Sequence, residues 1–120
     1  MTITFQRHPG AKYLELGGGS RPFLHPRCQG GEDVCVDVRP CQDAEGRPTV
    51  DFIADLNEPL ALTTGEFDGV LSVYALEHLS WRKVRSFLKE VCRVLRPGGK
   101  AVFVTANTEA QIRWTCRTRR

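Results

Sequence analysis

A short apolar run that ends in glycines constrains the fold of this chain more than any other feature. It spans Tyr13–Ser20 (YLELGGGS), and about twenty residues further on a second apolar run, Val34–Val38, ends around the acid Asp37. Glycines carry no Cβ and therefore let a ligand approach the backbone, while an acid at the second strand end can accept hydrogen bonds from both hydroxyls of a ribose. The pair predicts two neighbouring strands whose ends bind a nucleoside-like cofactor.

The rest of the chain alternates strand-like and loop-like segments, which is typical of an α/β fold with a mostly parallel sheet. One clear helix is predicted, with Ser80 as N-cap, apolar residues at helical spacing from Trp81 to Leu95, and Pro97-Gly98-Gly99 at its end. Trp81 and Phe87 are expected in the core, and Asn107 is expected to cap a final helix that extends to Trp114. The predicted strands are 12–16, 34–38, 50–54, a part of 67–74, and 100–105.

Length and composition predict one globular domain over residues 1–120, with 41% hydrophobic and 26% charged residues. No apolar run approaches the roughly 20 residues of a membrane span, and the first ten residues lack the pattern of a secretion signal. These observations predict a cytoplasmic protein without a membrane partner. Residues 106–120 carry the whole net charge of +3 and are expected to form a basic tail or a truncated helix, which makes a nucleic-acid partner unlikely but leaves it open.

The five cysteines form no C-x-x-C pair, and their number is odd, so reduced and independent thiols are expected. A zinc set can be drawn from His25, Cys28, Cys35 and Cys41. Zinc ligands usually come in closely spaced pairs on tight turns, however, and Cys35 lies inside a predicted strand. The sequence therefore predicts no metal site.

A dinucleotide-binding G-x-G-x-x-G motif fails here because its last position falls on Pro22. A wider set of segments occurs in a specific order: residues 14–19 (LELGGG), 36–37 (VD), 52–56 (FIADL), 67–70 (FDGV), 76–79 (LEHL) and 93–100 (RVLRPGGK). In these segments the chain resembles the class I S-adenosylmethionine-dependent methyltransferases, in particular their small ubiquinone-biosynthesis-like branch.

The resemblance implies a role for each matching residue at the cofactor. The glycine backbone would lie against the methionine portion and the ribose, and Glu15 would face the ammonium group. Asp37 would take the two ribose hydroxyls and Asp55 the adenine amino group. Val38 would pack on the adenine, and the backbone amide of Leu56 would donate to its ring. Residues 72–74 would close the site near the sulfonium. The implied cofactor-binding residues are Glu15, Gly17, Gly18, Gly19, Asp37, Val38, Asp55, Leu56, Ser72 and Tyr74. Asp55 has the alternative interpretation of a turn former before Asn57, because Asp often bonds the backbone two residues on.

His78 is the one candidate for a general base, needed only if the methyl acceptor must lose a proton. The resemblance also implies a Rossmann-like sheet of order 3-2-1-4-5 with few helices. Because the chain stops soon after the fifth strand, the family's usual C-terminal strand pair is expected to be missing. Natural proteins avoid a bare apolar edge. We therefore expect one of three situations: the chain is a fragment of a longer protein, a homodimer or another partner covers the fifth strand, or the domain binds cofactor without catalysis.

The implied function is that of an S-adenosylmethionine-dependent methyltransferase core with an unidentified acceptor, which could be a small molecule, a saccharide or a macromolecule. A degenerate module that binds S-adenosylmethionine without catalysis and acts through a partner remains the alternative, since fold alone does not settle catalysis. A nicotinamide-dependent oxidoreductase is disfavoured by Pro22 and by the later segments.

Overall fold

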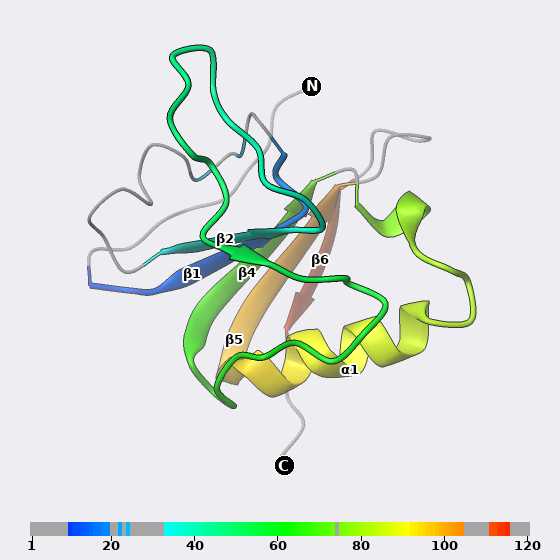
Figure 1. Ribbon diagram of the computed structural model, residues 1–120. Coiled ribbons are helices and arrows are strands. Elements are labelled where there is room, and N and C mark those ends of the chain that lie inside the picture. The colour runs from blue at the N-terminus through cyan, green and yellow to red at the C-terminus, as the bar shows by residue number, and fades with distance from the viewer. Residues whose placement is uncertain are drawn as a thin grey trace.

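The protein is described here by a computed structural model that covers residues 10–19, 22, 24, 33–73, 75–104 and, for the backbone alone, 111–115. Its elements form one mixed sheet with a single long helix against it (Figure 1). In chain order these are β1 Tyr13–Leu16, β2 Val34–Asp37, β3 Phe52–Ile53, β4 Phe67–Val73, the 3-10 turn η1 Leu76–His78, α1 Val84–Val94, β5 Leu95–Val104 and β6 Gln111–Thr115.

The strand order is β3-β2-β1-β4-β5-β6, and all neighbours are parallel except β5 and β6. The predicted order of the first five strands is confirmed, since β1 pairs with β2 on one side and with β4 on the other. The chain thus winds outward from β1 to β3 and then returns to place β4 on the opposite side. Such a reversal of direction leaves a crevice at the carboxyl ends of the central strands.

The C-terminal part of the sheet corrects two predictions. Residues 111–115 form a strand antiparallel to β5, where a helix or a basic tail was expected. The reason lies in the sequence QIRWT, in which polar and apolar residues alternate with the period of a strand. Because β6 covers the free side of β5, the argument for a homodimer or partner at that edge is wrong. The interpretation of residues 1–120 as one domain stays a prediction.

The main core lies between α1 and one face of the sheet. Phe87, Val91 and Val94 recur at helical spacing and are almost completely buried, as predicted for Phe87. The ring of Phe87 packs edge-on against that of Phe103 on β5, with 6.3 Å between the ring centroids. Among the described residues, no helix is both long enough and apolar enough to pass through a bilayer.

The start of α1 corrects the prediction for Trp81. The segment before the helix forms a turn, closed by a bond from the Lys83 amide to the Ser80 carbonyl (2.8 Å), and the helix begins only at Val84. Trp81 therefore lies outside the buried stripe, with 78% of its surface exposed. At the other end α1 passes directly into β5 at Leu95, before the predicted Pro-Gly-Gly stop.

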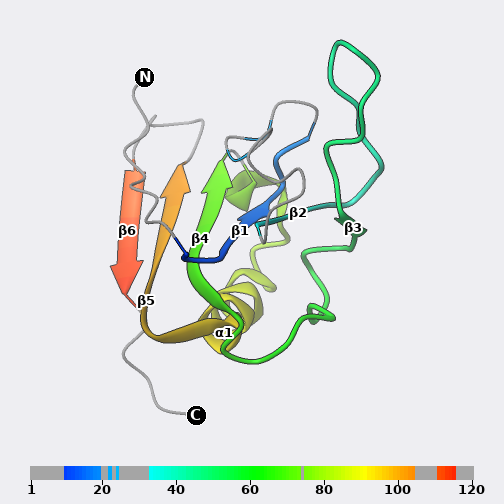
Figure 2. The same ribbon diagram turned by 90° about the vertical axis from the view of Figure 1, so that its left-hand side faces the viewer.

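The connections that follow β2 and β3 contain no helix, as their length predicts (Figure 2). The first of them, residues 38–51, projects from the sheet as a long loop. The second is held to α1 by Arg93, whose guanidinium donates to the carbonyls of Leu60 (2.8 Å) and Leu62 (2.8 Å) and pairs with Glu90 (2.8 Å). The bond from Arg93 lowers the pKa of the Glu90 carboxyl below its ordinary value of 4.5.

The cysteines depart from the prediction at one position. Cys92 is disulfide-bonded, to a partner that is not among the described residues, so the expectation of independent thiols is wrong there. Spacing along the chain cannot show which cysteines meet in space. No group of three potential metal ligands comes together within the described ranges, and His25 and Cys28 of the weighed zinc set lie outside them.

Candidate functional site

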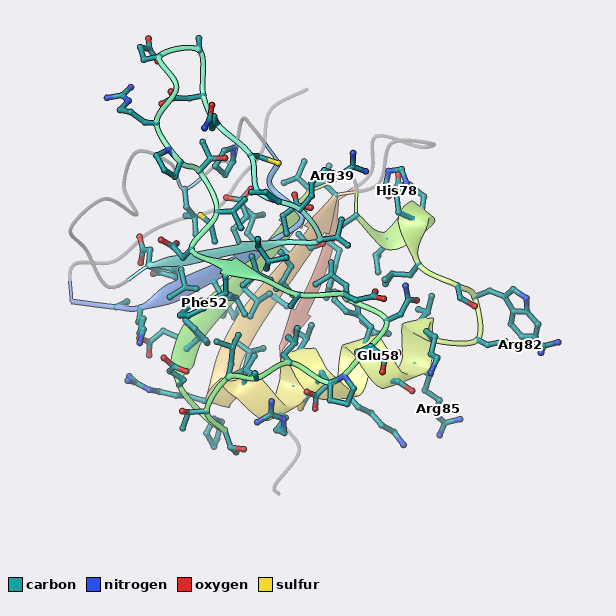
Figure 3. All side chains as sticks on the ribbon, viewed as in Figure 1. Arg39, Phe52, Glu58, His78, Arg82 and Arg85 are labelled. Carbon is teal, nitrogen blue, oxygen red and sulfur yellow. The ribbon has the colours of Figure 1, made fainter. Side chains whose placement is uncertain are left out.

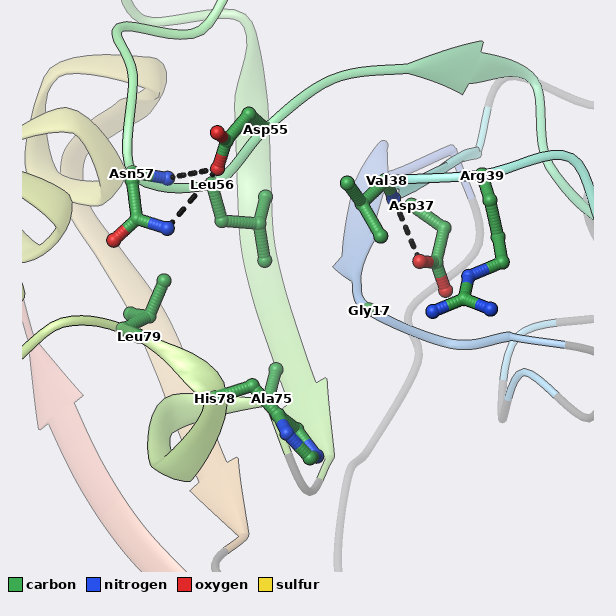
Figure 4. Close-up of a pocket in the computed structure, with 10 residues that line it drawn as sticks. All are labelled: Gly17, Asp37, Val38, Arg39, Asp55, Leu56, Asn57, Ala75, His78 and Leu79. Atoms are coloured by element: carbon green, nitrogen blue, oxygen red, sulfur yellow. Dashed lines mark hydrogen bonds between the residues drawn. The ribbon is translucent and has the colours of Figure 1, made fainter.

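A cavity of about 360 Å³ opens at the carboxyl ends of β1, β2 and β3, beside η1 (Figure 4). Its volume is within the range of small-molecule sites. Its lining consists of Gly17, Asp37, Val38, Arg39, Asp55, Leu56, Asn57, Ala75, His78 and Leu79. Six of these are predicted site residues. The additions lie in, or within two residues of, the segments that carry the family resemblance: Arg39, Asn57, Ala75 and Leu79.

The first two glycines of the run leave no room for side chains. Gly17 has a φ of +80°, and a Cβ built on it would meet the Cβ of Ala75 at 2.7 Å. A Cβ on Gly18 would meet the Cβ of Pro22 at 2.6 Å. Two conditions therefore require glycine at position 17: the left-handed backbone and the close approach of the segment after β4.

Asp37 and Thr49 form hydrogen bonds with the backbone amide and carbonyl of Gly19, respectively. The Gly19 amide donates to Oδ2 of Asp37 (2.7 Å), and the Gly19 carbonyl accepts from the Thr49 hydroxyl (2.7 Å). Oδ1 of Asp37 accepts from the Val38 amide at 2.6 Å. Each carboxylate oxygen has a second lone pair, so Asp37 can still accept from two ligand hydroxyls. Thr49, which is 4% exposed, has no motif around it that predicts this contact.

Asp55 and Asn57 form the wall opposite the glycines. Oδ1 of Asp55 accepts from the backbone amide (2.9 Å) and the side-chain amide (3.1 Å) of Asn57. The side-chain oxygen of Asn57 in turn accepts from the Ser80 amide (3.2 Å), which ties this loop to the segment after η1. The local-turn interpretation of Asp55 is therefore correct, and the same residue also lines the cavity.

Several predicted residues do not reach the cavity lining. Glu15 is buried beneath the glycine loop, where its Oε1 accepts from the Leu24 amide (2.7 Å). Ser72 is buried on β4, and its hydroxyl finds no hydrogen-bond partner among the described residues. Gly18 and Gly19 belong to the loop but not to the lining, and Tyr74 lies outside the described residues.

The chemistry of the lining suits a cationic nucleoside better than a phosphorylated one. Two carboxylates, Asp37 and Asp55, face a cavity whose single fixed cation among the described residues is Arg39, and no lysine takes part. Phosphate sites instead present lysine or a cradle of backbone amides. The donor set therefore fits a ligand with ribose hydroxyls and positive charge.

Residues 14–103 match the family model described as a methyltransferase domain. The chain belongs to this family. The match covers β1 to β5, and so it includes every strand that contributes to the cavity.

Two curated relatives illustrate the similarity. A phthiotriol/phenolphthiotriol dimycocerosates methyltransferase of Mycobacterium ulcerans is 32% identical over 119 residues, which are 92% of this chain and 43% of that protein. A demethylmenaquinone methyltransferase of Beutenbergia cavernae is 32% identical over 104 residues, 83% of this chain and 42% of that protein. The chain thus spans less than half the length of both relatives.

A solved structure supports the fold. The S-adenosylmethionine-dependent methyltransferase of Mesorhizobium loti superimposes with a TM-score of 0.60 at 25% identity, over 80% of this chain and 47% of that one. The predicted Rossmann-like methyltransferase fold is confirmed.

Proposed function

We propose that this chain binds S-adenosylmethionine in the cavity at the strand ends and transfers its methyl group to a lipid or quinone acceptor. The cofactor follows from the family. The acceptor class is proposed because the relatives described above are named for a dimycocerosate lipid and for demethylmenaquinone. The observation that carries the proposal is the Asp37 carboxylate, held by the Gly19 amide at the rim of the cavity.

The lining offers a place for each part of an adenosyl group. Asp37 would accept from the ribose hydroxyls, and Val38 and Leu56 would contact the adenine. Asp55, whose Oδ2 makes no bond to Asn57, would accept from the adenine amino group. Glu15 would support the glycine loop from beneath, because its carboxylate accepts from the Leu24 amide. Its role at the ammonium group of the cofactor stays a prediction.

S-adenosylmethionine supplies a methyl group that is already activated by a sulfonium leaving group. The chain therefore needs mainly to orient the acceptor and to exclude water. His78 lines the cavity from η1 and is exposed, and both observations support the proposal that it accepts a proton from an acceptor hydroxyl. If His78→Ala retains full turnover with an acceptor that must lose a proton, His78 is not the base.

Isothermal titration with S-adenosylhomocysteine and with NAD tests the cofactor assignment. We expect S-adenosylhomocysteine to bind and NAD not to bind, and Asp37→Asn to weaken binding while Glu45→Gln, on the exposed loop, leaves it unchanged. Tight binding of NAD would overturn the proposal. Methyl transfer from labelled S-adenosylmethionine to a quinone then tests catalysis, and binding without transfer would support the non-catalytic alternative. A cytoplasmic location stays a prediction.

A further inference from the structure

The segment from Ser80 to Lys89 holds four cations and no acid. Arg82, Lys83, Arg85 and Lys89 are all exposed, and none of them forms an ion pair with another described residue. Elsewhere in the described structure, Lys12, Arg47, Arg93 and Arg96 are each paired with an acid, whereas Arg39 and Lys100 form no ion pair with a described residue and lie outside this segment. Together with Trp81, the four unpaired cations define what we call the Trp81 surface.

Trp81 is the most exposed large apolar side chain of the described residues, at 78%. The Arg82 guanidinium lies 5.0 Å from the centroid of its ring, which is a cation–π contact. The indole is therefore held at the surface beside a positive charge, where it is neither packed into the core nor isolated. Tryptophan and arginine together are typical of residues that sit at the headgroup level of a bilayer.

The Trp81 surface begins at the rim of the cavity. His78 and Leu79 line the cavity, and the turn that carries Trp81 follows them directly. Figure 3 shows Arg82 and Arg85 projecting outward on the same side of the molecule as His78. Among the described residues, the acids next to this surface are Glu77 on η1, Glu58 and Glu90.

Lys83 and Lys89 line a second cavity of about 310 Å³ together with Glu58 and Glu90. Glu90 is paired with Arg93, so its charge is already compensated. Glu58 is the remaining acid in the lining of this second cavity, against four cations on the Trp81 surface. The surface keeps a positive excess and is complementary to an anionic partner.

We propose that the Trp81 surface docks on an anionic phospholipid bilayer and so places the rim of the cavity against the lipid phase. The cations would lie among the phosphates, and Trp81 would enter the interfacial layer. The link to catalysis rests on the proposed function, because a lipid acceptor would then reach the cavity without crossing water. The expectation of no membrane partner considered only a spanning segment, and a peripheral contact requires none.

A nucleic acid fits this surface less well. Single-stranded nucleic acids bind through bases stacked on a free aromatic face as well as through cations. Arg82 already occupies one face of the Trp81 ring. A lipid interface requires no free face of the ring, because the indole only has to enter the headgroup layer.

Vesicle flotation tests the docking without cofactor or acceptor. The whole chain is mixed with phosphatidylcholine vesicles or with vesicles that also contain phosphatidylglycerol, and the bound fraction is measured. We expect binding only to the anionic vesicles, weakened about fivefold by each cation removed, as in Arg82→Gln and Arg85→Gln. Lys100→Gln, an exposed cation on β5, is the matched control and should bind as the wild type does. Circular dichroism verifies that each variant is folded.

Tryptophan fluorescence gives a second measurement. Anionic vesicles should shift the emission of the wild type to shorter wavelength, and Trp81→Phe should abolish that shift. Equal binding to neutral and anionic vesicles, an unchanged affinity of the double arginine variant, or tighter binding to a single-stranded oligonucleotide would each overturn the proposal. Because S-adenosylhomocysteine binding is measured without vesicles, the docking and the proposed function can fail separately.

Discussion

The contact between Thr49 and Gly19 makes a sharp test of how the cavity is built. The Thr49 hydroxyl donates to the Gly19 carbonyl at 2.7 Å, while the Gly19 amide donates to Asp37. Thr49→Val replaces the hydroxyl by a methyl group of similar size and removes this bond alone. The backbone of Thr49 stays bonded to the carbonyl of Cys41 (3.0 Å), so the variant should fold.

The magnitude follows from the burial of the bond. Thr49 is 4% exposed, so solvent does not replace its hydroxyl, and loss of such a bond costs about 1–2 kcal/mol. Without it the glycine loop can leave the arrangement in which Gly19 holds Asp37. A ligand then binds only the fraction of molecules in which the loop has this arrangement, and its affinity falls in proportion to that fraction. The cost corresponds to an affinity for S-adenosylhomocysteine about five- to thirtyfold weaker.

Isothermal titration of the wild type, Thr49→Val and Thr49→Ser with S-adenosylhomocysteine measures the effect. The serine variant keeps a hydroxyl and should retain most of the affinity. Urea unfolding of the same proteins separates a general loss of stability from a loss of binding. If Thr49→Val binds with wild-type affinity, or if Thr49→Ser is as weak as Thr49→Val, the hydroxyl does not position the loop.

Three further changes test the same structure. Gly17→Ala should lower the free energy of unfolding by about 2–4 kcal/mol in urea, because it combines a φ of +80° with a clash against Ala75, and a loss below 1 kcal/mol would contradict the geometry. Asp37→Asn should weaken S-adenosylhomocysteine about ten- to a hundredfold in calorimetry with little change in the unfolding midpoint. The lowered pKa of Glu90 beside Arg93 means that its stabilising contribution is present at neutral pH and is lost as pH falls below 4.5 through the folded-state pKa. Glu90→Gln should therefore unfold more easily at pH 7, and its stability should fall less than that of the wild type when the pH is lowered through this range.

The parallel part of the sheet and one half of the cavity could be predicted because their signals are local. The run that ends at Gly17 and the run that ends at Asp37 each combine a strand pattern with a residue type that is typical of a nucleoside-binding strand end. Parallel strands bring their carboxyl ends to one edge, so residues far apart in the chain are expected to meet there. The pairing of β1 with β2 and β4 confirms this reasoning.

The errors have physical causes of their own. Trp81 fits the helical period, but a turn delays the helix to Val84, and a period cannot show where a helix begins. Residues 111–115 are short enough for helix and strand patterns to compete, and the free side of β5 decides in favour of a strand. Both errors concern short segments whose structure depends on contacts outside the segment. The Ser80 amide at the turn before α1 is bonded to Asn57, and residues 111–115 pair with β5.

The contacts that hold the loops at the cavity and beside it were also hidden from the sequence, and their separation explains why. The Thr49–Gly19 bond spans 30 residues, the Ser80–Asn57 bond 23, and the bond from Arg93 to the Leu60 carbonyl 33. In a sheet whose connections after β2 and β3 lack helices, packing alone does not position these loops. Single side chains bonded to distant backbone groups add to the packing of Leu56, Leu60 and Leu62 against the core. The walls of the cavity should therefore be more sensitive to polar substitutions at such positions than to conservative changes in the core under α1, where neighbouring side chains can repack.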